Sequence, residues 1–320
     1  MQEPLVTVLV SVYNHANYIE ECLRSIAAQR VDFPIEVLVG EDCSTDDTRA
    51  VLRRLEPELP SYFTILYREK NMGSVANGED LYSRTRGKYL VDFEGDDFML
   101  FDGRLQKQAD FLEAHPDYTA VSSNSLVVGA DSRPNGEKYP ECHDEEYSWK
   151  EYFYSCMPGQ SGSIMCRAQD YFAARDNFVA LKRYDSYPGD RRNAFLWLCM
   201  GRVRCFQEQW NAYRHIKKGG SSYSATTKVN EGYAKNEVLF GRTLVEYADR
   251  YGTEDARRTA RLTWYRLRLK WAISKLGSER PGQVLHDLMG ERGRVGLLLS
   301  PLRWYGVLGV RTLLGRGVTL

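Results

Sequence analysis

The first hundred residues alternate between short apolar runs and longer segments of mixed polarity. Apolar runs rich in Val, Ile and Leu cover residues 6–12, 35–39, 63–67 and 89–93, which is the pattern of strands buried on both faces. Helices are expected between them, at about 17–29, 47–55 and 74–86. Strands and helices that alternate through short loops predict a parallel sheet with right-handed crossovers.

The pattern loosens in the second part of the chain. Strands are predicted at 121–128 and 161–166, and the polar stretch 131–146 between them is typical of an exposed excursion. An apolar helix is predicted at 193–200. From about residue 209 onward the sequence favours helix.

Length and composition suit one large globular domain with an appendage. The chain has 320 residues, of which 43% are hydrophobic and 27% charged, values that are ordinary for a globular protein with a sizeable core. We therefore expect an α/β fold with a mostly parallel central sheet and a helical C-terminal region. The boundary is predicted at residues 225 and 226, which gives a catalytic domain of 1–225 and a basic helical region of 226–320.

The cysteines and the apolar runs indicate where in the cell the protein is expected. Seven cysteines, an odd number without C-x-x-C spacing, argue against both a disulfide framework and a zinc site. No basic segment precedes the first apolar run, and no run approaches the roughly 18 apolar residues of a spanning helix. These features predict a cytoplasmic protein.

The zero net charge hides a polarity along the chain. From residue 251 to the end there are 13 Lys or Arg against 5 Asp or Glu, and within 257–271 the basic residues are interleaved with Leu and Trp. Basic amphipathic helices with Trp suit an anionic membrane face. One hypothesis is therefore peripheral attachment to the inner face of the membrane through residues 257–320. The alternative is a helical subdomain with an Arg-rich exposed side.

Three carboxylates, Glu94, Asp96 and Asp97, end the fourth predicted strand. Crowded carboxylates repel each other and are costly to desolvate. A hard divalent cation such as Mg²⁺ or Mn²⁺ removes that cost and can also bridge phosphates. The competing interpretation is a solvated acidic turn.

Polar residues also follow the other predicted strands. Tyr13 and Asn14 come after the first strand, and Glu41 and Asp42 after the second. Ligands of parallel α/β sheets bind beyond the carboxyl ends of the strands. The convergence of these loops favours a site for a metal ion and a nucleotide over a solvated turn.

In order and spacing these segments resemble the inverting glycosyltransferase family 2, which has the GT-A fold, a Rossmann-like fold of nucleotide-diphospho-sugar transferases. The resemblance rests on residues 8–14, 40–48, 71–77 and 87–97, within 4–104, and more weakly on 189–221. It implies a nucleoside diphosphate sugar as donor, most simply a UDP-sugar, with Mn²⁺ or Mg²⁺ as cofactor.

The resemblance also implies roles for particular residues. The set expected to contact the nucleotide-sugar is Ser11, Tyr13, Asn14, Glu41, Asp42, Gly73, Asn77, Glu94, Asp96, Arg214 and His215. Asp96 and Asp97 are the expected metal ligands, and the sequence leaves open which is the closer. For two of these residues the sequence also allows a role without a ligand. Arg214 could equally pair with a surface acid. His215 could be an ordinary loop histidine near Gly219-Gly220, which give the loop flexibility.

Two positions depart from the family pattern. Glu94 stands where the family has Asp, which moves the charge by one methylene and leaves its ribose contact in question. Cys43 stands where Gly is usual, and this substitution bears on the local backbone.

The expected chemistry needs a base. The acceptor hydroxyl is a poor nucleophile and requires a general base on the opposite face of the sugar. By resemblance Asp190 is that base, and the competing interpretation of Asp190 is a helix N-cap.

The sequence thus predicts a metal-dependent inverting glycosyltransferase that moves a sugar to a saccharide or lipid-linked acceptor, in the synthesis of a bacterial surface polysaccharide. No nucleic-acid partner is expected. A sugar-phosphate nucleotidyltransferase is disfavoured because residues 11–17 lack a glycine- and basic-rich phosphate loop, and a dinucleotide oxidoreductase because no G-x-G-x-x-G follows the first strand. A non-catalytic nucleotide-sugar-binding or scaffold protein remains the alternative from another class.

Overall fold

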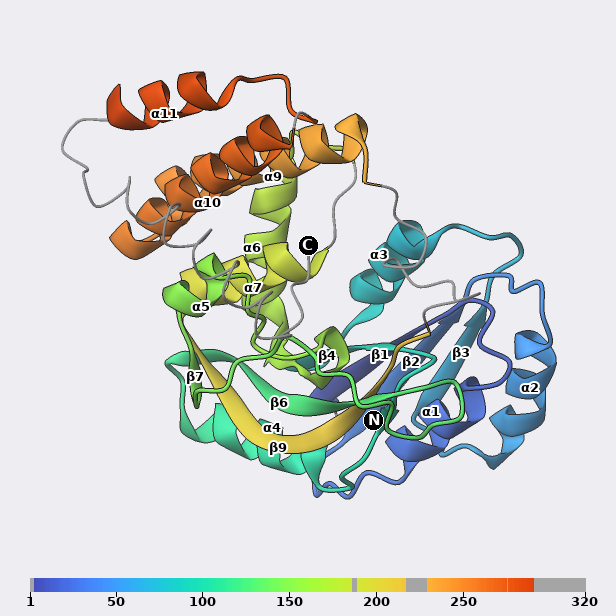
Figure 1. Cartoon of the computed structure of the whole chain (residues 1–320). Helices are drawn as coiled ribbons and strands as arrows, with labels where there is room; N and C mark the ends of the chain where they lie inside the picture. The colour runs from blue at the N-terminus through green and yellow to red at the C-terminus, as the bar shows by residue number, and fades with distance from the viewer. Residues whose placement is uncertain (1–2, 186–188, 217–228, 275, 291–320) are drawn as a thin grey trace. The chain divides into compact units, whose positions relative to one another are not determined.

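A computed structural model describes residues 3–185, 189–216, 229–274 and 276–290. The chain forms two compact units, drawn together in Figure 1. The sheet unit consists of Met1–Glu146, Pro158–Phe172 and Gly201–Lys217, and the helical unit of Tyr147–Met157, Ala173–Met200 and Lys218–Leu320. The boundary expected at residue 225, between a catalytic domain and a basic helical region, stays a prediction, because the division into compact units does not identify the residues that catalysis needs.

The N-terminal half of the sheet is parallel, in the strand order β3-β2-β1-β4. Its strands are β1 (Val6–Val12), β2 (Ile35–Glu41), β3 (Phe63–Tyr67) and β4 (Tyr89–Glu94). The connections contain α1 (Ile19–Ala27), α2 (Thr48–Leu55), the short η1 (Glu56–Glu58) and α3 (Ser74–Arg84). Strand β1 is almost wholly buried between its neighbours, as its β-branched run predicts. The predicted α/β class with a mostly parallel sheet is confirmed.

The sheet continues from β4 through β8, β6 and β9 to β5. The bounds are β5 (Phe98–Met99), β6 (Tyr118–Val128), β8 (Met165–Arg167) and β9 (Arg202–Arg214), with the two-residue β7 (Glu146–Tyr147) off this path. Strands β6 and β9 run side by side and parallel over most of their length (Figure 1). Helix α4 (Arg104–Ala114) follows β5 along the chain.

Two predicted elements are wrong in part. The strand expected at 161–166 is instead a short 3₁₀ turn, η2 (Ser161–Ser163), followed by β8. The Ser-Gly-Ser sequence favours a turn, and Ser163 N–H donates to the Gln160 carbonyl at 2.8 Å. The helix bias expected from residue 209 is wrong up to Arg214, because β9 extends that far and buries alternate residues such as Val203 and Cys205.

Helices make up the second unit. They are α5 (Trp149–Phe153), α6 (Ala168–Ala180, which begins in the sheet unit), α7 (Gly189–Met200), α9 (Glu231–Tyr251), α10 (Glu254–Ile273) and α11 (Pro281–Gly290). Helices α9 and α10 lie side by side (Figure 1). The Asn230 side chain caps α9 and the Thr253 side chain caps α10, as expected for these residue types. The prediction of a helical C-terminal region is confirmed.

Most basic residues of α10 are engaged inside this unit. Arg268 is buried and pairs with Glu279 and Asp287, while Arg266, also buried, donates to the Phe153 carbonyl. These contacts fit a helical subdomain, but its arginines are mostly paired within the protein, and Arg258 is the exposed one among the described basic residues of α10. Within the described residues, no helix is long and apolar enough to cross a membrane.

Candidate functional site

The carboxyl ends of β1, β2 and β4 meet at one edge of the sheet. Val12 pairs with Glu41, and Ser11 pairs with Glu94. The Asp42 N–H donates to the Val12 carbonyl at 2.9 Å. The sheet register therefore brings the residues predicted from three separate loops to one place in the sheet unit.

The β1–α1 loop is tied to the β2–α2 loop by Asn14. This residue has a φ of 58°, a left-handed conformation that Asn tolerates better than most residues. Its side-chain oxygen accepts from Thr45 N–H at 2.8 Å, and its own N–H donates to Ser44 Oγ at 3.0 Å. Tyr13, which precedes it, is half-buried.

The two acids after β2 do different things. Glu41 is fully buried and binds the Arg49 guanidinium and Ser44 N–H, so its carboxylate is committed to the protein. The oxygens of Asp42 accept from the N–H groups of Met72 and Gly73 at 2.6 and 2.9 Å. Asp42 is 3% exposed, and these two bonds make it the residue that fixes the 71–73 loop.

Asn77 is buried beneath this edge. Its Nδ2 donates to the Gly40 carbonyl at 2.9 Å, and its Oδ1 accepts from Arg68 at 3.1 Å. A Cβ at position 40 would lie 2.6 Å from Asn77 Oδ1, which explains the glycine there. Asn77 thus supports the site from below, through contacts with the protein.

The three carboxylates after β4 differ in their surroundings. Glu94 is exposed and Asp97 is 1% exposed. Asp97 accepts from Arg214 N–H at 2.8 Å and from Gln160 Nε2 at 2.9 Å, one bond on each oxygen. Asp96 has a buried Oδ1 with no hydrogen-bond partner among the described residues. Of the two expected metal ligands, the geometry therefore favours Asp96.

Charge repulsion accompanies this arrangement. Burial raises the pKa of Asp97 well above its usual range, and the Asp96 and Glu94 carboxylates raise that pKa further. Hydrogen bonding from Arg214 N–H opposes the rise in the pKa of Asp97. The cluster is therefore held at an electrostatic cost that a nearby cation would relieve.

No preformed metal cage accompanies Asp96. Among the described residues, no group of three or more His, Cys, Asp or Glu side chains is placed to hold an ion. Mg²⁺ and similar ions are commonly bound by one or two carboxylates together with substrate phosphates. The unpartnered oxygen of Asp96 fits that mode of binding.

Arg214 lies inside the protein, with a fully buried side chain. Its guanidinium donates to the Asp96 and Gly129 carbonyls and to Glu21 Oε2, each at 2.8 Å. It therefore pairs with an acid, which is one of the two sequence interpretations, and acts on the site by holding the backbone of the acidic turn.

His215 pairs with an acid as well. Its Nδ1 lies 2.5 Å from Glu137 Oε2, and its N–H donates to the Val128 carbonyl at 3.0 Å. Gly219 and Gly220, to which the sequence assigns loop flexibility, lie outside the described residues.

His15 is a further residue of this site, and the sequence predicts it only as part of the loop that follows the first strand. Its Nε2 lies 4.0 Å from Asp96 Oδ2, and its Nδ1 is buried without a partner in the described chain. Burial lowers the pKa of His15, while the Asp96 carboxylate opposes that shift. A histidine directly after Tyr13-Asn14 is the one signal in the sequence that points to it. Gln160 also contacts the acidic turn, and no sequence feature distinguishes it.

Asp190, the expected base, belongs to the helical unit. It is the second residue of α7, inside the first turn, where the helix dipole favours a carboxylate. The surrounding protein raises the pKa of Asp190, and Arg192 opposes that shift. The side chain of Asp190 is itself exposed to solvent.

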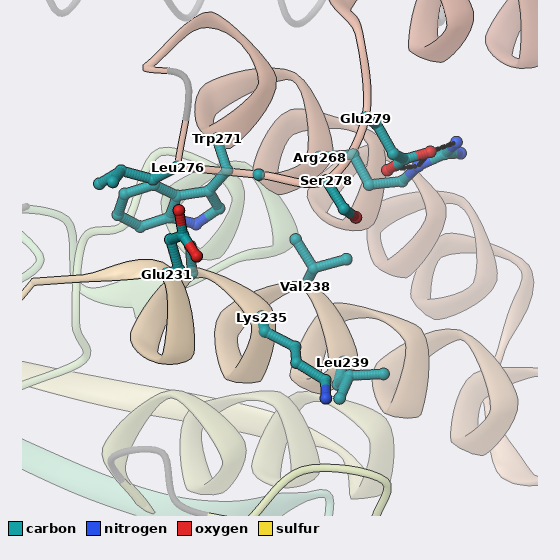
Figure 2. Close-up of a pocket in the computed structure, with 11 residues that line it drawn as sticks. Glu231, Lys235, Val238, Leu239, Arg268, Trp271, Leu276, Ser278 and Glu279 are labelled. Atoms are coloured by element: carbon teal, nitrogen blue, oxygen red, sulfur yellow. Dashed lines mark hydrogen bonds and ion pairs between the residues drawn. The ribbon is translucent and has the colours of Figure 1, made fainter.

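A pocket of about 580 Å³ lies in the helical unit, between α9, α10 and residues 276–279. Figure 2 shows Val238 and Leu239 on α9 and Trp271 on α10 around it, with the paired Arg268 and Glu279 beside them. None of the residues predicted for the donor, the metal or the base lines this pocket.

Comparison with solved structures identifies the class of fold. TarS of S. aureus (residues 1–349), solved in complex with UDP, matches with a TM-score of 0.59 and 18% identity, over 84% of this chain and 72% of that one. The same protein solved with UDP-GlcNAc matches with a TM-score of 0.60 and 15% identity, over 98% and 93%. The fold is that of GT-A nucleotide-diphospho-sugar transferases, as the sequence predicts.

The family follows from the sequence match. This chain belongs to glycosyl transferase family 2, whose model matches residues 7–179. The Mycobacterium tuberculosis protein Rv1520 is 37% identical over 133 residues, which are 41% of this chain and 38% of that protein. EpsE of Bacillus subtilis is 27% identical over 212 residues, or 66% and 69%. The matched region thus spans well under half the length of the mycobacterial relative.

Proposed function

We propose that this protein is a metal-dependent inverting glycosyltransferase. In this proposal it moves one sugar from a nucleoside diphosphate sugar, a UDP-sugar in the first instance, to a hydroxyl of a saccharide or lipid-linked acceptor. The observation that carries it is the unpartnered oxygen of Asp96, located at the carboxyl edge of a parallel sheet in a family 2 chain. Its setting, by resemblance, is the synthesis of a bacterial surface polysaccharide.

The donor is proposed to bind over the ends of β1 and β2. Tyr13 would lie against the base, and Asp42 would accept from the base edge with the lone pairs that Met72 and Gly73 leave available. The choice of UDP is supported by the fold neighbours solved with UDP and UDP-GlcNAc. Glu94 remains the candidate for the ribose hydroxyls, since it is exposed at this edge.

Asp96 is proposed to hold Mn²⁺ or Mg²⁺ together with the donor. Such an ion would supply Lewis-acid stabilisation of the charge that develops on the leaving diphosphate. Since one carboxylate is a weak site by itself, Asp96 would be expected to bind the ion tightly only in the presence of the diphosphate of the donor.

Asp190 is proposed to act as the general base. It would accept the proton of the acceptor hydroxyl while that oxygen forms a bond to the anomeric carbon and the bond from this carbon to the diphosphate breaks. Attack opposite the leaving group inverts the anomeric configuration. This role rests on the family resemblance around residues 189–221.

The test is a thermal-shift screen of nucleotides and nucleotide-sugars with Mn²⁺ or with a chelator. A ligand that binds the folded state raises the melting temperature by mass action, so UDP is expected to stabilise the protein more with Mn²⁺ than with chelator. Asp96→Asn should abolish the difference, and Asp110→Asn, an exposed acid on α4, should retain it. The proposal fails if no nucleotide stabilises the wild type in a Mn²⁺-dependent way.

Transfer is tested separately from binding. Asp190→Asn should bind Mn²⁺ and donor as the wild type does, while turnover falls by at least about a hundredfold, the usual contribution of a general base. Wild-type turnover in Asp190→Asn would refute the base assignment. Donor binding without transfer or hydrolysis, for every acceptor tried, would favour the non-catalytic alternative.

A further inference from the structure

A buried chain of polar side chains runs beneath the acidic turn. It begins at Arg104, the first residue of α4, which is 0% exposed. Its guanidinium donates to Asn211 Oδ1 at 3.0 Å and to Gln108 Oε1 at 3.1 Å. Burial lowers the pKa of Arg104 to about 9, so the side chain remains charged at neutral pH.

The chain then passes through two amides to a carboxylate. Asn211 Nδ2, on β9, donates to Gln160 Oε1 at 3.1 Å. Gln160 Nε2, just before η2, donates to Asp97 Oδ2 at 2.9 Å. None of these side chains is more than 2% exposed, so the chain is shielded from solvent.

Arg104, a donor, and Asp97, an acceptor, determine together the direction of the bonds in this chain. A buried amide by itself can turn its oxygen or its nitrogen toward a neighbour. Arginine only donates, so Asn211 must present its oxygen to Arg104 and its nitrogen to Gln160. Gln160 must then receive with its oxygen and present its N–H to Asp97.

Asp97 connects this chain to the proposed metal ligand. Its second oxygen accepts from Arg214 N–H at 2.8 Å, and the Arg214 guanidinium holds the Asp96 carbonyl at 2.8 Å. The position of the Asp96 backbone therefore depends on how Asp97 and Arg214 are held.

We propose that Arg104, Asn211 and Gln160 form a positioning chain that fixes Asp97 and, through it, the turn that presents Asp96 to the metal ion and the diphosphate. The inference deepens the proposed function and rests on it. These residues are positioning residues, since they act on the ligand only through Asp97. Supporting groups of this kind commonly change metal affinity when they are altered.

Gln108 provides a matched control. It is as buried as Gln160, receives one hydrogen bond from Arg104 and donates one to the Ser163 carbonyl at 2.9 Å. Gln160 likewise receives one buried bond and donates one, to Asp97, and its Nε2 also donates a longer, part-buried bond to Ser161 Oγ at 3.3 Å. Gln108→Met and Gln160→Met therefore each remove two buried hydrogen bonds, and Gln160→Met also removes the part-buried bond to Ser161.

The experiment measures Mn²⁺ and UDP affinity by titration calorimetry, together with the melting temperature without ligand. Both Met variants should lose similar thermal stability. Gln160→Met should weaken binding of Mn²⁺ in the presence of UDP by about tenfold or more. Gln108→Met should bind within about twofold of the wild type, and equal losses of affinity in the two variants would overturn the inference.

Asn211→Asp tests the direction of the hydrogen bonds in the positioning chain. It also provides a second test if Gln160→Met does not fold. Aspartate keeps the acceptor for Arg104, with added charge, but has no N–H for Gln160, so the Gln160 oxygen must face an acceptor either at position 211 or at Asp97, and the hold on Asp97 is expected to weaken. The expected result is a melting temperature at or above that of the wild type with at least about tenfold weaker Mn²⁺ binding in the presence of UDP.

The outcomes separate this inference from the proposed function. A wild-type protein that binds no Mn²⁺ with UDP would refute the proposed function and the inference with it. A wild type that binds, with Asn211→Asp or folded Gln160→Met binding equally well, would refute the positioning chain alone.

Discussion

Cys43 has a backbone φ of 54°, in the left-handed region where a Cβ is unfavourable. The sequence marks this position because Gly is usual there in the family, and the structure shows that the backbone keeps a conformation suited to glycine. Cys43→Gly is expected to raise the free energy of unfolding by up to about 1 kcal/mol, because relief of the steric cost exceeds the entropy that glycine adds to the unfolded chain. Urea denaturation measures this, and Cys43→Ala, which keeps the Cβ, should give no gain.

Substitution of the neighbouring acids Asp96 and Asp97 is expected to have different effects on the stability of the protein. Asp96→Asn removes the proposed ligand but breaks no hydrogen bond from its unpartnered oxygen, so the free energy of unfolding should change by less than about 1 kcal/mol. Asp97→Asn places an NH₂ group against one of two buried donors and should cost about 2–4 kcal/mol. Chemical denaturation without metal compares them, and equal stability of the two variants would contradict the distinction.

Glu141 makes the free energy of unfolding depend on pH, and no motif or spacing in the sequence indicates this. It is 8% exposed, and burial raises its pKa from 4.5 to about 7. Because the folded state holds the proton more tightly, this residue's favourable contribution is complete below about pH 4.5 and is lost as the pH rises through 7.

The matching prediction concerns Glu141→Gln, whose oxygen can still accept from Ser125 N–H as Glu141 does at 3.0 Å. The variant should gain stability relative to the wild type between pH 5 and pH 8, by up to roughly 3 kcal/mol. Denaturation curves at the two pH values test it. Glu145→Gln, at an exposed acid, should show no such change.

At the scale of elements, close approach of α9 and α10 depends on Gly241. A Cβ there would lie 3.1 Å from Trp264 Cα, tighter than ordinary contact and set by backbone. Gly241→Val should therefore cost about 1–3 kcal/mol, as overpacking does. Gly78 in α3 has nothing within 4 Å of its added Cβ, so Gly78→Ala should instead gain about 0.5–1 kcal/mol from helix propensity. Urea denaturation checks both, and a stabilised Gly241→Val would contradict the packing argument.

The predicted elements succeed where one local signal dominates. Strands β1, β3 and β4 are continuous apolar runs, and their observed bounds follow those runs. No strand is predicted from the sequence for β9, because three consecutive exposed residues at 207–209 interrupt its alternation. Pairing with β6 holds that segment in the sheet, and such pairing depends on a partner about ninety residues earlier in the chain.

At the scale of the whole molecule, the basic C-terminal region divides into two parts. Arg257, Arg261, Arg266, Arg268 and Lys270 all have partners inside the helical unit. Membrane attachment, if it is a property of this region, is therefore expected to depend on the residues after Gly290, where the sequence places further Arg among apolar residues.

Sedimentation with anionic vesicles tests this expectation. A chain ending at Gly290 should lose binding to the vesicles, and the full chain with Arg258→Glu, an exposed position on α10, should bind as the wild type does. Equal sedimentation of the full and shortened chains would exclude the tail as an anchor. Loss of vesicle binding in Arg258→Glu would instead show that α10 contributes to membrane binding.

The sequence by itself determined the order of the elements, the parallel half of the sheet and the loops at which polar residues gather. These are local properties, since apolar runs, turn residues and strand order are written along the chain. Only the tertiary structure decided what each polar side chain does. Burial and partners distant in sequence commit Glu41, Asn77 and Arg214 to the protein, leave Asp96 with an unpartnered oxygen, and bring Gln160 and Asn211 beneath the acidic turn. Hydrogen-bond donors and acceptors find their partners in space, and no pattern along a single chain specifies them.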